Sequence, residues 1–114
     1  MTSNPSEQPV AIITGAARGI GLACVKWFLA HSYRVALLDV DNAELLKASV
    51  ALGEPERVLA LHCDVASPVD VNAVIEKTSA TFGRIDALVN NAGIAVFKPL
   101  LKHTFEEWRQ VMAV

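Results

Sequence analysis

The chain has 114 residues, 53% of them hydrophobic, and a formal net charge of −2, which allows one domain with a substantial core. Lysine and arginine occur singly, which argues against a nucleic-acid surface and a polybasic membrane patch. No apolar stretch approaches the roughly 18 residues of a membrane span, so we expect no membrane association. Cys24 and Cys63 have neither disulfide nor metal-ligand spacing, so we expect reduced thiols, no metal site and a cytoplasmic location.

Strand-like and helical apolar patterns alternate along the chain after a polar tail at residues 1–9, within one domain predicted over 10–114. Strands are predicted over 10–13, 34–39, 57–62 and 85–90, and helices over 19–31, 42–52, 68–82 and from Thr104. Ser67 is a predicted N-cap, and Gly83 is the predicted end of that helix. The residues predicted to face the core are Leu45, Leu46 and Ala48 in the second helix and Val71, Val74 and Ile75 in the third. Trp27 and Trp108 are interpreted as core or interface side chains.

This alternation predicts the fold class: an α/β protein with a Rossmann-type, doubly wound parallel sheet and right-handed crossovers. In the dinucleotide-binding arrangement, four strands lie in the order 3-2-1-4 and the ligand binds at their carboxyl ends. The strand over 85–90 would then be an open edge of the sheet.

Residues 14–21 read Thr-Gly-Ala-Ala-Arg-Gly-Ile-Gly and join the first predicted strand to the first predicted helix. Glycine here lets the chain turn tightly and lets a pyrophosphate approach the backbone, which a Cβ would obstruct. The helix directs its free N–H groups and the positive end of its dipole at the same point. The segment therefore predicts a dinucleotide site that includes Gly15, Arg18, Gly19, Ile20 and Gly21.

Asp39 ends the second predicted strand, 18 residues after Gly21, near the spacing expected of an acid that binds the adenosine ribose. A carboxylate there accepts hydrogen bonds from the ribose hydroxyls and repels a 2′-phosphate. Arg18 favours a 2′-phosphate, but a fixed, partly buried carboxylate outweighs one flexible guanidinium, so we expect NAD rather than NADP. The alternative is that Asp39 is a solvated or helix-capping residue, although Asp41 could be that cap.

Polar residues also follow the third and fourth predicted strands. Asp64 and Val65 follow the third strand, where an acid can face the amino group of an adenine. Residues 90–93, Asn-Asn-Ala-Gly, end the fourth strand, where Asn side chains can bond the neighbouring backbone and a ribose together. An ordinary Asn-Gly loop is the alternative for this segment.

Taken in order, Thr-Gly-x-x-x-Gly-x-Gly at 14–21, Asp39, Asp64-Val65 and Asn-Asn-Ala-Gly at 90–93 resemble the short-chain dehydrogenase/reductase family. The resemblance implies hydride transfer between a nicotinamide and an alcohol or ketone, in a full-length protein that forms a homo-oligomer. It also implies residue roles. Gly15 and Ile20 would lie at the phosphates, Asp39 at the adenine ribose, Asp64 and Val65 at the adenine, and Asn91 near the nicotinamide-side ribose, with Ala92 and Gly93 in the same segment. Thr14 would tie the first turn to residues 90–93.

The catalytic groups of that family, a serine, a Tyr-x-x-x-Lys pair and a helical asparagine, have no match in the chain. The single tyrosine, Tyr33, is followed four residues later by Leu37 instead of lysine. We therefore expect the cofactor-binding half of such an enzyme, incomplete at its C-terminus and without a catalytic residue. Two alternatives stay open: a non-enzymatic dinucleotide-binding or interaction module, and an inactive truncated fragment.

Overall fold

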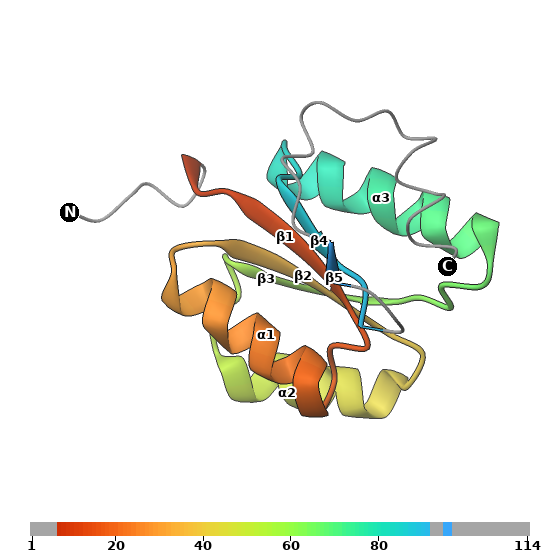
Figure 1. The fold of residues 1–114 in the computed structure, drawn as a ribbon, viewed down its shortest axis with the longest axis horizontal. Coiled ribbons are helices and arrows are strands. Elements are labelled where there is room, and N and C mark those ends of the chain that lie inside the picture. The colour runs from red at the N-terminus through yellow and green to blue at the C-terminus, as the bar shows by residue number, and fades with distance from the viewer. Residues whose placement is uncertain (1–6, 92–94, 97–114) are drawn as a thin grey trace.

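Strands and helices alternate in the computed structural model, which describes residues 7–91 and 95–96 of the chain (Figure 1). In chain order the elements are β1 (Val10–Thr14), α1 (Gly19–Ala30), β2 (Arg34–Asp39), α2 (Asn42–Leu52), β3 (Val58–His62), α3 (Pro68–Phe82), β4 (Ala87–Val89) and β5 (Ala95–Val96). The predicted alternation is confirmed from residue 10 to residue 90. The predicted helix from Thr104 and Trp108 lie outside the described residues.

The strands form one sheet in the order β3-β2-β1-β4-β5. β1, β2, β3 and β4 pair in parallel, which confirms the predicted order 3-2-1-4. β5 is antiparallel to β4, with Leu88 opposite Val96 and Val89 opposite Ala95. The prediction of an open edge at β4 is therefore wrong for Leu88 and Val89. A strand of two residues is too short to show the period of two by which strands are recognised in a sequence.

Helices cover both faces of the sheet, α1 and α2 on one side and α3 on the other (Figure 1). Alternate residues of each strand point to opposite faces. Ile13 and Leu37 pack in the cluster formed with α1 and α2, while Ile12 and Leu38 pack in the cluster formed with α3. Because both faces are covered, β1 and β2 are almost continuously buried.

The ends of α2 and α3 follow the capping residues of the sequence. The Asp41 carboxylate accepts a hydrogen bond from the Glu44 N–H, and the Ser67 hydroxyl accepts one from the Asp70 N–H. Both helices end at a glycine in the left-handed region, where a residue with a Cβ is strained. The predicted caps at Ser67 and Gly83 are confirmed, and Asp41 is the cap that the sequence offered as an alternative to Asp39.

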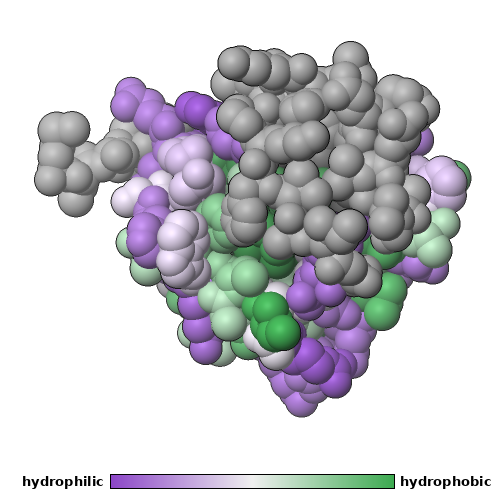
Figure 2. Space-filling model, viewed as in Figure 1, coloured by the Kyte–Doolittle hydropathy of each residue, from purple (hydrophilic) through white to green (hydrophobic). Residues whose placement is uncertain are grey.

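The surface of α1 and α2 keeps large apolar side chains in contact with solvent. Leu46 is 65% exposed, so its predicted inward orientation is wrong, whereas Leu45 and Ala48 are buried as predicted. Successive residues of a helix point about 100° apart, and only one stripe of α2 reaches the sheet. Trp27 is 53% exposed and stacks on His31, so it is not a core residue. Figure 2 shows hydrophobic residues between hydrophilic ones on this side of the molecule.

Candidate functional site

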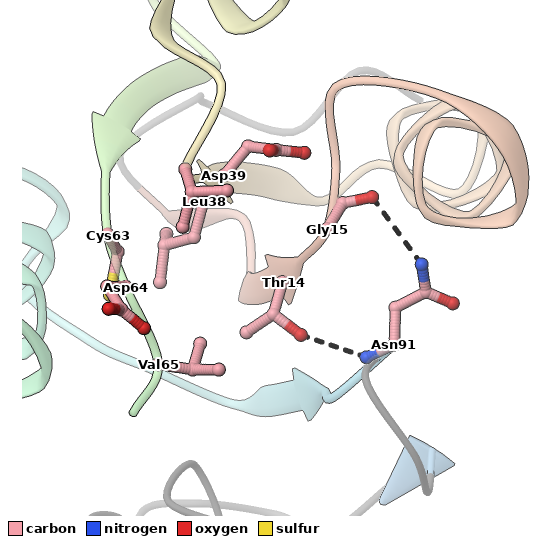
Figure 3. Close-up of a pocket in the computed structure, with 9 residues that line it drawn as sticks. Thr14, Gly15, Leu38, Asp39, Cys63, Asp64, Val65 and Asn91 are labelled. Carbon is pink, nitrogen blue, oxygen red and sulfur yellow. Dashed lines mark hydrogen bonds between the residues drawn. The ribbon is translucent and has the colours of Figure 1, made fainter. Parts of the chain in front are cut away.

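A hollow of about 200 Å³ lies where the parallel strands β1, β2 and β3 end (Figure 3). β1 is flanked by β2 on one side and β4 on the other, so the order of the strands reverses here. Open α/β sheets bind ligands in the crevice outside the carboxyl ends of the strands at such a point. The lining residues come from four connections: Thr14, Gly15, Leu38, Asp39, Val40, Cys63, Asp64, Val65 and Asn91.

The turn between β1 and α1 uses glycine where the structure leaves no alternative. Gly15 and Gly19 have φ angles of 60° and 61°, in the left-handed region that favours glycine. A Cβ on Gly21 would lie 1.9 Å from the Gly15 carbonyl oxygen, so the first turn of α1 closes against the loop only because Gly21 lacks a side chain. The loop thus brings the N-terminus of α1 and its unpaired N–H groups close to the strand ends.

Asp39 is held by the backbone of two turns. Its Oδ2 accepts a hydrogen bond from the Ala17 N–H at 3.0 Å, and its Oδ1 accepts one from the Asp41 N–H at 3.0 Å. The Ala16 N–H donates to the Leu38 carbonyl at 3.1 Å, which ties the same two turns together. An ionised carboxylate has about four acceptor positions, so Asp39 keeps acceptor capacity for a further donor.

Arg18 is the basic residue of the glycine turn. It is the N-cap residue of α1 but makes no capping hydrogen bond with its side chain. Its guanidinium instead donates to the Asp41 carboxylate and forms an ion pair with it at the surface. Arg18 therefore links the glycine turn to the turn between β2 and α2. The hydrogen bond from the Ala17 N–H to Asp39 joins the same two turns.

Asp64 and Val65 follow β3 and line the hollow beside Cys63. The Asp64 Oδ1 accepts from the Ala66 N–H at 2.9 Å, and the Asp64 N–H donates to the Asp70 carboxylate at 3.0 Å. These bonds fix the loop between β3 and α3. Burial, with the charges of Asp70 and Asp64, raises the pKa of the Cys63 thiol to about 11, so Cys63 is a neutral lining residue near pH 7.

Thr14 and Asn91 join the end of β1 to the end of β4. The Asn91 N–H donates to the Thr14 hydroxyl oxygen at 2.9 Å, and the Asn91 side-chain amide donates to the Gly15 carbonyl at 3.5 Å (Figure 3). The Thr14 hydroxyl lies 3.2 Å from the Asn90 Oδ1, to which it can donate. The predicted tie between Thr14 and the Asn-Asn segment is confirmed. It holds the glycine turn against the neighbouring strand.

The structure brings together most residues that the sequence singled out. Five of them line the hollow: Gly15, Asp39, Asp64, Val65 and Asn91. Arg18, Gly19, Ile20 and Gly21 form the adjoining turn and the start of α1, while Ala92 and Gly93 lie outside the described residues. Three further lining residues, Leu38, Val40 and Cys63, were not predicted from the sequence. Their positions next to Asp39 and Asp64 at strand ends were the available signal.

Over residues 7–91 and 95–96, no group of three or more His, Cys, Asp or Glu side chains is placed to hold a metal ion. None of the helices in that part of the chain has the length and apolar character to cross a membrane.

A family model described as short chain dehydrogenase matches residues 9–114. The chain belongs to this family. The match covers the glycine turn, both aspartate positions and the Asn-Asn segment, so the resemblance drawn from those motifs is confirmed. Short-chain dehydrogenases use NAD(P), and the Rossmann-type fold of this chain agrees with that cofactor class.

Individual relatives support the family assignment. The chain is 45% identical to 2-(R)-hydroxypropyl-CoM dehydrogenase of Xanthobacter autotrophicus over 111 residues, covering 92% of this chain and 44% of that protein. L-sorbose reductase of Gluconobacter frateurii, solved with NADPH and L-sorbose, superposes with a TM-score of 0.71 at 33% identity over 93% of this chain and 44% of the other. The 3-ketoacyl-(acyl-carrier-protein) reductase of Brucella melitensis, solved with NADH, gives 0.66 at 32% identity over 70% and 32%. The chain thus spans less than half the length of these proteins.

Proposed function

We propose that the chain is the dinucleotide-binding part of an NAD(P)-dependent oxidoreductase whose substrate is a small alcohol or ketone. The observation that carries this proposal is that Gly15 and Asp39 line one hollow where the strand order reverses, and that the Ala17 N–H of the turn leading into α1 donates to Asp39. When bound, the nicotinamide cofactor supplies or accepts the hydride. The residues described here bind and orient it.

The glycine turn fits a pyrophosphate. Gly19 leaves the backbone of the turn uncovered, because no atom lies within 4 Å of the position that its Cβ would take, and the N–H groups and dipole of the α1 N-terminus attract negative charge. In this proposal the backbone from Gly15 to Ile20 holds the phosphates, and Gly19 supplies the left-handed turn between them. Ile20 is 74% exposed and available for contact with a ligand.

The rest of the hollow fits the adenosine and the second ribose. Asp39, with acceptor capacity left, would bind the hydroxyls of the adenine ribose, and Asp64 with Val65 would face the adenine. Asn91 would lie at the nicotinamide-side ribose, followed by Ala92 and Gly93. The Thr14 hydroxyl holds Asn91 through its backbone N–H, while the Asn91 side-chain amide donates to the Gly15 carbonyl at 3.5 Å.

The charges around the hollow favour NAD over NADP. Asp39 and Asp64 line it, and Asp41 lies beside Asp39 and pairs with Arg18, so three carboxylates but a single guanidinium lie at or next to the hollow among the described residues. A 2′-phosphate would bring further negative charge into this group.

The free thiols of Cys24 and Cys63 support a cytoplasmic location, and the family supports a homo-oligomer for the complete protein.

Binding of NADH to the wild type and to Gly15→Ala tests the proposal. Gly15→Ala puts a Cβ 3.0 Å from the Asn91 amide nitrogen, at the turn that would hold the phosphates, so we expect at least about a tenfold loss of affinity. Gly53→Ala is the matched control. Gly53 has a similar φ of 65° but ends α2 away from the hollow, so it imposes similar backbone strain without touching the site. Calorimetry that finds no NADH binding to the wild type, or an equal loss in both variants, would refute the proposal.

A further inference from the structure

The Arg18–Asp41 ion pair lies beside the position that the proposed function gives to the adenine ribose. The Ala17 N–H donates a hydrogen bond to the Asp39 carboxylate, and the ion pair between Arg18 and Asp41 joins the same two turns. The pair is accessible, because the Arg18 side chain is 64% exposed and that of Asp41 is 38% exposed. A ligand at Asp39 would therefore meet Arg18 already engaged by a carboxylate of this chain.

We propose that Asp41 is a specificity-determining residue: it occupies the Arg18 guanidinium and so withholds it from a 2′-phosphate on the adenosine ribose. This inference rests on the proposed function and adds a residue to it. Asp41 acts through Arg18, as an intramolecular competitor for the group that would otherwise recognise NADP.

Competition of this kind follows from the chemistry of the two anions. Asp41 engages Arg18 through its Nη2, so a 2′-phosphate is denied the paired contacts that include this nitrogen and meets a guanidinium whose charge is already balanced by a carboxylate. A 2′-phosphate must either displace Asp41, which leaves that carboxylate beside the new dianion, or accept only the N–H donors that Asp41 leaves, with the carboxylate still close by. Both routes weaken the binding of NADP, whereas NAD has no 2′-phosphate for Arg18 to contact. An exposed ion pair adds little to folding stability, so its effect on ligand choice can be measured separately.

Asp41→Asn is the decisive variant, because it removes the charge and preserves the fold around it. Asparagine is as good an N-cap as aspartate, so the bond that Oδ1 accepts from the Glu44 N–H can be kept. The bond from the Asp41 N–H to Asp39 involves only the backbone of residue 41 and is unaffected. Circular dichroism and thermal unfolding confirm that each variant folds.

The probes are ADP-ribose and 2′-phospho-ADP-ribose, which differ only in the 2′-phosphate and need no nicotinamide subsite. Calorimetry at low salt gives their two dissociation constants for the wild type, Asp41→Asn, Arg18→Met and the double variant. Arg18 contacts to the pyrophosphate are common to both probes and cancel in the ratio of the two constants. Glu44→Gln is the charge-matched control, because it removes a nearby carboxylate that pairs with Lys47 and not with Arg18.

We expect the wild type to prefer ADP-ribose and Asp41→Asn to shift the ratio about tenfold toward the 2′-phosphate, the effect of freeing one charge-assisted contact. With Met at position 18, the same Asp41 substitution should shift the ratio by less than about threefold, and so should Glu44→Gln alone, because only general charge changes.

Equal shifts with and without Arg18, or no shift at all, would overturn the inference while leaving the proposed function intact. If the wild type binds neither probe, the proposed function fails and this inference fails with it. The two failures are distinguishable, because the inference can fail alone only if the wild type binds ADP-ribose tightly.

Discussion

Single residues at the strand ends are fixed in place before any ligand arrives. Asp39 accepts one hydrogen bond from each of two turns, so its carboxylate cannot rotate away without breaking contacts at Ala17 or Asp41. A group held in this way loses little conformational entropy when it binds a ribose, which increases its contribution to affinity. In the proposed function, the same fixed charge would oppose a 2′-phosphate on the adenine ribose.

Asp39→Ala should weaken NADH binding about tenfold, the cost of losing hydrogen bonds to an ionised acceptor. NADPH should lose less or gain affinity, because the repulsion of its 2′-phosphate disappears. Fluorescence titration with both reduced cofactors measures the two changes. Glu76→Ala, which removes an exposed charge on α3, should leave the NADH-to-NADPH ratio unchanged. Tighter binding of NADPH than NADH by the wild type would show that Arg18 outweighs Asp39.

At the scale of elements, local signals predicted the structure well where one residue decides the outcome. Ser67 caps the start of α3 and Gly83 caps its end, as the sequence indicated, since a capping hydroxyl and a left-handed glycine act within their own turn. The predicted inward orientation of Leu46 and the predicted open edge at β4 are wrong for another reason. Which stripe of α2 faces the sheet depends on how the helix packs, and β5 depends on pairing with β4. The Arg18–Asp41 pair could not be predicted either, because its partners lie 23 positions apart in the sequence and two turns must meet before they can pair.

The cap of α3 offers a test of this local control. Ser67→Ala removes the acceptor of the Asp70 N–H and should lower the free energy of unfolding by about 1 kcal/mol. Ser67→Asp restores an acceptor and places a negative charge at the helix N-terminus, so it should recover the wild-type value. Urea unfolding followed by circular dichroism measures both. A loss that Asp fails to restore would mean that Ser67 matters through another contact.

Across the whole molecule, the parallel sheet separates the candidate site from the opposite edge. The carboxyl ends of β1, β2 and β3 meet at the hollow, whereas the amino ends carry other contacts. There the buried Arg34 guanidinium donates to the Gln8 carbonyl at 2.7 Å, and Arg84 pairs with Asp86. Burial, with the nearby charge of Arg84, lowers the pKa of Arg34, but an arginine remains protonated at every physiological pH. These contacts hold the sheet and lie away from the proposed chemistry.

Tyr33 lies at the amino end of β2, at the edge of the sheet opposite the hollow. It precedes the first residue of β2, while Asp39 ends that strand, so roughly 20 Å of extended chain lies between them. Its ring packs edge-on against Phe28 at a centroid distance of 4.8 Å. The only tyrosine of the sequence is thus too far from the hollow to transfer a proton to a bound alcohol.

We therefore expect the purified 114-residue chain to bind NADH but to show no oxidation of alcohols with NAD. Tyr33→Phe keeps the ring and removes only the hydroxyl, so it should leave NADH affinity within about twofold, less than a typical hydrogen bond contributes. Absorbance at the nicotinamide band over a panel of secondary alcohols, with calorimetry for binding, measures both outcomes. Turnover that follows the chain through purification and disappears in Gly15→Ala would show that this chain itself contains a group that transfers the proton. If Tyr33→Phe also abolished that turnover, the group would be Tyr33, and the distance argument would be wrong.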